Sequence, residues 1–248
     1  MKVLLLSHTP QPEKLVSKAA KLCYSSSSIE EIGENQSDEQ IQKFVKMLAD
    51  MGHESPLEHI NFTFAIEGVS RSLLAQLTRH RIASYSVQSQ RYVKNSTKEY
   101  IIPPEIEAIP EAKSEFLKAI DTAYQSYASI TEILKSHYTE KASSSDSCHK
   151  TQQKNAEKLA IEDARYILPN ACTTKLICTF NARSLLNFFK HRCCNRAQWE
   201  IRSLAWNMLD IVKTIAPSIF ATAGPTCIYG KCSEGKMSCG NPFTQEDL

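Results

Sequence analysis

Two long stretches of this 248-residue chain contain no acidic residue, although each carries six Lys or Arg residues. They are residues 68–98 and 164–199, and they hold 12 of the 29 basic residues and none of the 27 acidic ones. Cations gathered without carboxylates repel one another, so a folded chain keeps them most easily where an anion completes the cluster. Arginine predominates and binds phosphate through two parallel hydrogen bonds, which favours a compact phosphate-bearing ligand.

The same stretches could instead form basic surface faces or a nucleic-acid-binding module. Such a module predicts extended basic faces with exposed aromatic residues between the cations. Here both stretches have the pattern of folded amphipathic segments, and the aromatic residues mostly follow the rhythm of a core. The sequence therefore favours a small-molecule ligand, and we expect no nucleic-acid partner.

The composition is that of a globular protein with a substantial core. Hydrophobic residues make up 42% and charged residues 23%, with only 7 Gly and 10 Pro, which argues against disorder and against a small disulfide scaffold. The apolar runs are too short for a membrane span, and the first one ends at Ser7, too early for a signal peptide. Nine cysteines, an odd number, favour reduced thiols. We expect a cytoplasmic protein with no membrane contact.

Hydrophobic periodicity predicts an α+β fold in which helices outnumber strands. The expected strands are residues 1–7, 61–66 and 173–181. The expected helices are residues 13–24, 38–51, 70–78, 111–141, 154–167, 182–191 and 197–215. We predict a single domain over residues 1–248, with a small antiparallel sheet, several flanking helices and a polar loop near residues 143–153.

A cysteine-rich tail is expected near residues 223–248. Cys227, Cys232 and Cys239 lie there among Gly, Pro and Ser residues. Their spacing, C-x4-C-x6-C, is not a standard zinc pattern and lacks an obvious fourth ligand. The sequence favours a thiol-rich surface loop over a metal site, so no metal is expected.

The chain lacks the common nucleotide-binding and zinc-protease motifs. It contains no G-x-G-x-x-G, no G-x-x-x-x-G-K-[ST] and no H-E-x-x-H. If a nucleotide binds, side chains must hold its phosphates. The clearest positive feature is the segment RHRIASYSVQSQR at residues 79–91, which combines three arginines, a histidine and several hydroxyl groups. Such a dense set of donors can converge on one anion.

This segment resembles the R-H-R…S-x-R signature of the flavin-dependent thymidylate synthases. Three further segments are similar to motifs of that family and follow in the same order: HESPLEH at 53–59, RYILP at 165–169 and NARSLLNFF at 181–189. Arg192 follows at the family's spacing. The chain departs from the pattern at Ser86-Val87, where many members have Asn-Glu, which puts the role of the Val87 side chain in doubt.

The resemblance implies the reductive methylation of dUMP to dTMP in de novo dTMP biosynthesis. The carbon donor would be 5,10-methylenetetrahydrofolate, released as tetrahydrofolate, and NADPH-reduced FAD would be the hydride source. The resemblance also implies a homotetramer with active sites shared between subunits. A flavoprotein oxidoreductase without methyl transfer is the alternative that shares FAD and needs no dUMP site.

The resemblance also assigns individual residues. Those expected at FAD are His53, Ser55, Arg79, His80, Arg81, Val87, Asn181, Ala182, Arg183 and Asn187. Those expected at dUMP are Gln76, Leu77, Thr78, Arg79, Val87, Gln88, Ser89, Gln90, Arg91, Arg165 and Arg192. Arg192 is the expected catalytic residue, because a fixed guanidinium beside the pyrimidine stabilises negative charge on the ring.

Simpler roles remain open for some of these residues. His53 and His59 could be buried structural histidines, and Arg165 could cap the C-terminus of its helix. Ser89 could be a nucleophile, but the sequence fixes no base beside it, so a role as a phosphate donor is favoured.

Overall fold

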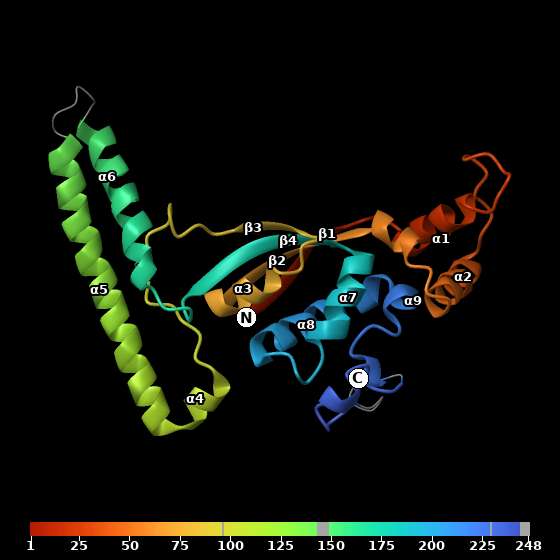
Figure 1. Ribbon diagram of the computed structural model, residues 1–248. Coiled ribbons are helices and arrows are strands. Elements are labelled where there is room, and N and C mark those ends of the chain that lie inside the picture. Colours follow the sequence, from red (N-terminus) through yellow and green to blue (C-terminus); the bar gives the residue numbers. More distant parts are fainter. Residues whose placement is uncertain (96, 143–148, 229, 244–248) are drawn as a thin grey trace. The chain divides into compact units, whose positions relative to one another are not determined.

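The computed structural model describes residues 1–95, 97–142, 149–228 and 230–243 (Figure 1). These residues form two compact units. Unit 1 comprises Met1–Glu67, Ala75–Ser86 and Leu176–Leu248, and unit 2 comprises Gly68–Leu74 and Val87–Lys175. The expectation of one domain over the whole chain stays a prediction.

A four-stranded antiparallel sheet has the strand order β1-β2-β4-β3. The strands are β1 (Lys2–His8), β2 (Asn61–Ser70), β3 (Ser84–Val87) and β4 (Thr173–Asn181). The mixed fold and the first, second and fourth strands confirm the sequence prediction. β3 was not predicted, because four residues are too few to show an alternating pattern.

Alternate side chains of strand β2 are buried in the hydrophobic core. Phe62, Phe64 and Ile66 alternate along it and are fully or almost fully buried, as expected for a strand that is half-buried. In unit 1, β2 pairs with β1 in a register that places Leu5 opposite Phe64 and Lys2 opposite Glu67, with an irregularity between Leu5 and Ser7.

The helices of unit 1 are α1 (Pro12–Leu22), α2 (Asp38–Asp50), the 3-10 turn η1 (Ser55–His59), α7 (Ala182–Arg192), α8 (Trp199–Ile215) and α9 (Pro217–Phe220). In Figure 1, α7 and α8 lie below this sheet, and α1 and α2 lie beyond its right-hand end. A run of phenylalanine contacts joins sheet to helices: Phe180 to Phe188, Phe188 to Phe189 and Phe189 to Phe220, with ring centroids 5.8–6.0 Å apart. This aromatic core fixes α7 against β4.

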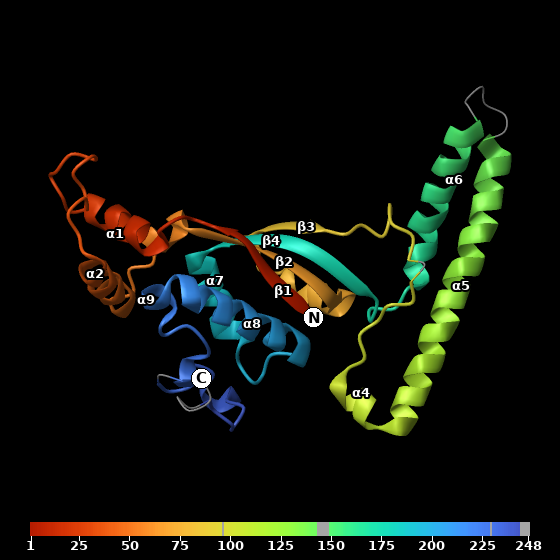
Figure 2. The ribbon, with the colours of Figure 1, turned by 180° about the vertical axis from the view of Figure 1, so that it is seen from behind.

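Unit 2 contains a long helical hairpin. Its helices are α4 (Pro104–Ala108), α5 (Pro110–Ala142) and α6 (His149–Ala164), followed by the 3-10 turn η2 (Arg165–Ile167). α5 and α6 lie side by side in both ribbon views (Figures 1 and 2). The short helix α3 (Arg71–Leu77) begins in this unit and ends in unit 1. No helix in the described ranges is long and apolar enough to cross a membrane.

Helix α6 corrects the prediction of a polar loop over residues 143–153. Residues 149–153 are helical, whereas residues 143–148 lie outside the described part of the chain. The reason is that Lys and Gln favour helix well even where no apolar periodicity marks one. Residues 165–167, predicted as the end of that helix, form η2 instead.

The tail after α9 packs against the rest of unit 1. It contains two short 3-10 turns, η3 (Thr226–Ile228) and η4 (Gly235–Met237). The Phe243 ring meets the edge of Trp206 on α8, with centroids 5.4 Å apart. The Asn195 side chain donates to the carbonyl of Asn241 at 2.9 Å. The described tail is therefore docked, and the eight cysteines of the described ranges are free thiols.

Candidate active site

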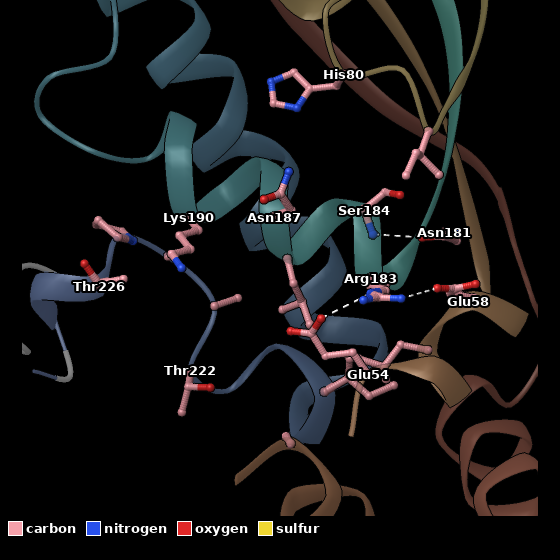
Figure 3. Close-up of a pocket in the computed structure, with 18 of the residues that line it drawn as sticks. Glu54, Glu58, His80, Asn181, Arg183, Ser184, Asn187, Lys190, Thr222 and Thr226 are labelled. Carbon is pink, nitrogen blue, oxygen red and sulfur yellow. Dashed lines mark hydrogen bonds and ion pairs between the residues drawn. The ribbon is translucent and has the colours of Figure 1, made fainter. Parts of the chain in front are cut away.

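A cavity of about 970 Å³ lies in unit 1 beside helix α7. Its walls come from η1, the segment that follows α3, the exposed face of α7 and the segment after α9 (Figure 3). Polar side chains are numerous on these walls: Glu54, Glu58, Arg79, His80, Arg81, Asn181, Arg183, Ser184, Asn187, Lys190, Thr222 and Thr226.

The start of α7 is fixed by a side-chain cap. Asn181, the last residue of β4, accepts a hydrogen bond from the backbone N–H of Ser184 at 2.8 Å, which satisfies a donor that the first helical turn leaves unpaired. Arg183, Asn187 and Lys190 are three or four residues apart and so lie on one helix face. All three line the cavity, which places cations and an amide along the same wall.

Arg183 is held by two carboxylates. Its Nε lies 3.2 Å from Glu54 Oε2, and its Nη1 lies 2.5 Å from Glu58 Oε1 (Figure 3). All three side chains are about half exposed. Both glutamates belong to the 53–59 motif, from which no role was predicted for them. Their spacing of four residues was the available signal, although nothing local shows that they meet an arginine far along the chain.

His80 accepts a hydrogen bond from Arg192. The Arg192 Nε lies 3.0 Å from His80 Nε2, and the imidazole meets the edge of the Phe188 ring at 4.9 Å. Burial, and then the positive charges of Arg192 and His191, lower the pKa of His80 to about 4. The imidazole is therefore neutral near pH 7, and its Nε2 is an acceptor for the guanidinium.

Tyr85 holds the backbone segment that contains His80 in place. The hydroxyl of Tyr85 lies 2.9 Å from the carbonyl oxygens of both Leu77 and His80, to which it donates. The Tyr85 ring packs at a right angle to Phe180, with centroids 5.8 Å apart. Because Tyr85 is anchored in the core in this way, the segment with Arg79, His80 and Arg81 has a defined position.

Arg192 and Arg79 form a cationic pair without acidic partners. Burial lowers the pKa of Arg192, and the charge of Arg79 lowers it further. Neither residue forms an ion pair with a carboxylate of the described ranges. Two guanidinium groups beside a neutral imidazole make a site that an anionic ligand would complete.

Unit 2 gathers a second set of arginines around the end of α6. Arg91 Nε lies 2.6 Å from Glu162 Oε1, and Arg165 Nε donates to the Glu162 carbonyl oxygen at 3.0 Å. Arg165 therefore does cap its helix, as the simpler interpretation held. Burial, and then the charge of Arg165, lower the pKa of Arg71, so cations from both acid-free stretches meet here.

The predicted FAD residues do not all lie at the cavity. Those that line it are Arg79, His80, Arg81, Asn181, Arg183 and Asn187. Ala182 is buried in the core, while His53 and Ser55 are exposed beside the cavity wall and do not line it. His53 and His59 are both exposed, so the alternative that they are buried structural histidines is wrong.

The predicted dUMP residues are divided between the units. Gln76, Leu77, Thr78, Arg79 and Arg192 belong to unit 1, whereas Val87, Gln88, Ser89, Gln90, Arg91 and Arg165 belong to unit 2. Leu77 is fully buried, so only its backbone could serve a ligand. Ser89 Oγ accepts from the backbone N–H of Arg91 at 3.2 Å. The assignments to dUMP and FAD stay predictions.

Comparison with known proteins decides the family. The family model described as thymidylate synthase complementing protein matches residues 4–218. The chain belongs to this family. A flavin-dependent thymidylate synthase of Clostridium tetani is 55% identical over 240 residues, covering 97% of this chain and 93% of the relative. Enzymes of the same name from Geobacter sulfurreducens (43%, covering 97% and 94%) and Sulfolobus acidocaldarius (38%, covering 100% and 85%) are similar over comparable lengths.

Proposed function

We propose that this protein is a thymidylate synthase that methylates dUMP to dTMP with bound FAD. The carbon donor in this proposal is 5,10-methylenetetrahydrofolate, released as tetrahydrofolate, and NADPH supplies the electrons. Family membership supports dTMP synthesis. The structural observation that carries the proposal is the cationic pair of Arg79 and Arg192 beside a neutral His80.

The cavity in unit 1 suits a flavin dinucleotide. Its volume is near the upper end of the range of about 300–1,000 Å³ that ligand pockets occupy. Arg79, Arg81, Arg183 and Lys190 line it and would meet the charges of a pyrophosphate. Bound there, FAD would supply the reducing hydride. Glu54 and Glu58 already share Arg183, so a phosphate at that residue has to compete with them.

Arg192 is the residue that we assign to the pyrimidine of dUMP. Its Nε donates to His80, and within the described part of the chain its two terminal nitrogens have no recorded partner, so they can donate to a ligand. Their positive charge would stabilise negative charge that develops at the ring. His80 thus holds the guanidinium in one orientation without neutralising it. In unit 2, Arg91, Arg165 and Ser89 offer charged or hydroxyl donors that would bind the phosphate.

We also propose a homotetramer with shared active sites, in the cytoplasm. Leu4 and Leu6 of the edge strand β1, and Met1 just before it, are 47–53% exposed, which suits burial against another subunit. The test mixes the inactive double variants Gln76→Ala/Arg79→Ala and Arg91→Ala/Arg165→Ala after mild dissociation. Partial return of activity supports shared sites, whereas a fully active monomer contradicts them.

The proposed reaction is tested with purified protein, FAD, NADPH, dUMP and methylenetetrahydrofolate. We expect the protein to retain FAD and to form dTMP, measured by chromatography, only when the folate is present. NADPH oxidation that never yields dTMP would favour the oxidoreductase alternative. A protein that fails to bind FAD would contradict the whole proposal.

A further inference from the structure

Four cysteines from two separate segments of unit 1 line one small cavity. Cys194 comes from the turn between α7 and α8, and Cys227, Cys232 and Cys239 come from the tail. The cavity is small, with a volume of about 10 Å³. The tail alone supplies three cysteines and no obvious fourth ligand. In the folded chain Cys194 lines the same cavity as these three cysteines.

Polar contacts hold the two segments together around these cysteines. Asn195 donates to the carbonyl of Asn241 at 2.9 Å, and Arg196 donates to the carbonyl of Met237. Beside the cavity, the backbone N–H of Asn241 lies 3.4 Å from Cys239 Sγ, and the Asn241 carbonyl oxygen lies 3.2 Å from the same sulfur.

We propose that Cys194, Cys227, Cys232 and Cys239 together bind one thiophilic divalent metal ion, for which Zn²⁺ is the probe. Four thiolates are a standard tetrahedral ligand set for zinc, with Zn–S distances of about 2.3 Å. Binding releases the thiol protons to solvent, and no oxidation or reduction takes place. The neighbouring cysteine, Cys193, is excluded because it is fully buried in the core and burial raises the pKa of its thiol.

The thiols have to turn toward the ion. Across the described ranges, no three His, Cys, Asp or Glu side chains are already arranged to hold a metal. A cysteine Sγ occupies different positions in its staggered rotamers, and three of these four side chains are partly exposed while Cys239 is exposed. They can therefore change rotamer without disturbing the core.

A metal at this position would act as a structural clamp. Cys194 follows Arg192 by two residues, and Cys227 follows Thr226, which lines the large cavity of unit 1. One ion would thus fix the end of α7 and the cavity wall formed after α9. The clamp's benefit to catalysis rests on the proposed function, whereas metal binding does not.

The test measures metal content in full-length protein, independently of turnover. Protein purified under reducing conditions is stripped with a chelator and reloaded with Zn²⁺ or Co²⁺. We expect about one Zn²⁺ per chain by elemental analysis, and a thiolate-to-cobalt charge-transfer band. Cys194→Ser should weaken zinc binding at least about tenfold, and Cys194→His should restore part of it, because histidine is also a zinc ligand.

The matched control is Cys23→Ser, which removes an exposed cysteine at the end of α1 and should bind zinc like the unmodified protein. Three results would overturn the proposal: no zinc or cobalt in the reloaded protein, equal zinc affinity with and without Cys194, or a disulfide among the four cysteines under the same reducing conditions. Protein that binds zinc yet makes no dTMP would contradict only the proposed function.

Discussion

The two arginines at opposite ends of α7 differ in the groups that hold them. Arg183, near the start of the helix, makes ion pairs with Glu54 and Glu58. Arg192, at its end, is hydrogen-bonded to a neutral His80 and has Arg79 as a charged neighbour. The charge of Arg183 is thus partly compensated within the protein, whereas that of Arg192 is not. An anionic ligand therefore gains more from Arg192.

The largest expected effect is that of removing the uncompensated arginine. Arg192→Ala should abolish measurable dTMP formation while FAD still binds. A hydrogen bond to a charged group contributes about 1.5–3 kcal/mol, or roughly 10–150-fold in rate, and a group essential to activation contributes more. Arg192→Lys is the control that keeps the charge and loses the planar fork, so it should retain a small part of the activity. Near-normal turnover of Arg192→Ala would contradict the catalytic assignment.

Removing the neutral partner should have a smaller effect. His80→Ala deletes the acceptor for Arg192 Nε, so the guanidinium is less well oriented and kcat should fall about tenfold, as for one lost hydrogen bond. His80→Gln can place an acceptor oxygen nearby and should lose less. FAD affinity, measured by fluorescence titration, separates orientation of Arg192 from loss of a cofactor contact. If both variants affect only FAD affinity, the positioning role is wrong.

The same imidazole should make the protein sensitive to acid. The pKa of His80 is lowered from 6.5 to about 4 in the folded protein, so the unfolded chain binds more protons between these values. The contribution of His80 to stability is therefore complete above pH 6.5 and is lost as the pH falls toward 4. Urea unfolding over this range should show a smaller acid-induced loss for His80→Gln. An identical loss would mean that His80 titrates normally.

The smallest effect is expected from the compensated arginine. Glu54→Gln/Glu58→Gln removes both ion pairs of Arg183, and each pair stabilises little because all three side chains are about half exposed to water. FAD should bind up to about fivefold more tightly, and the gain should shrink at high salt. Weaker binding of FAD would show that the carboxylates position Arg183 for the cofactor rather than compete with it.

The parts that sequence could predict are those with a local signature. The alternation of Phe62, Phe64 and Ile66 predicts β2, and the 3.6-residue rhythm predicts α7 and α8. The motifs assigned Arg79, His80, Arg183 and Asn187 to FAD, and these four residues line one cavity, although their role at FAD stays a prediction. The sequence did not predict that Arg183 forms ion pairs with Glu54 and Glu58, or that Cys194 lies at the same cavity as the tail cysteines. Contacts between distant segments depend on the packing of the whole unit.

Unit 2 is formed almost entirely by one continuous excursion of the chain, Val87–Lys175. It leaves at the end of β3 and returns at the start of β4, and the N–H of Gln88 donates to the carbonyl of Lys175 at 3.0 Å, close to both ends. An excursion whose ends are joined in this way can change length without moving the strands that bracket it. Insertions and deletions acquired during the divergence of this family should therefore accumulate in the helical hairpin, while β3, β4 and α7 keep their spacing.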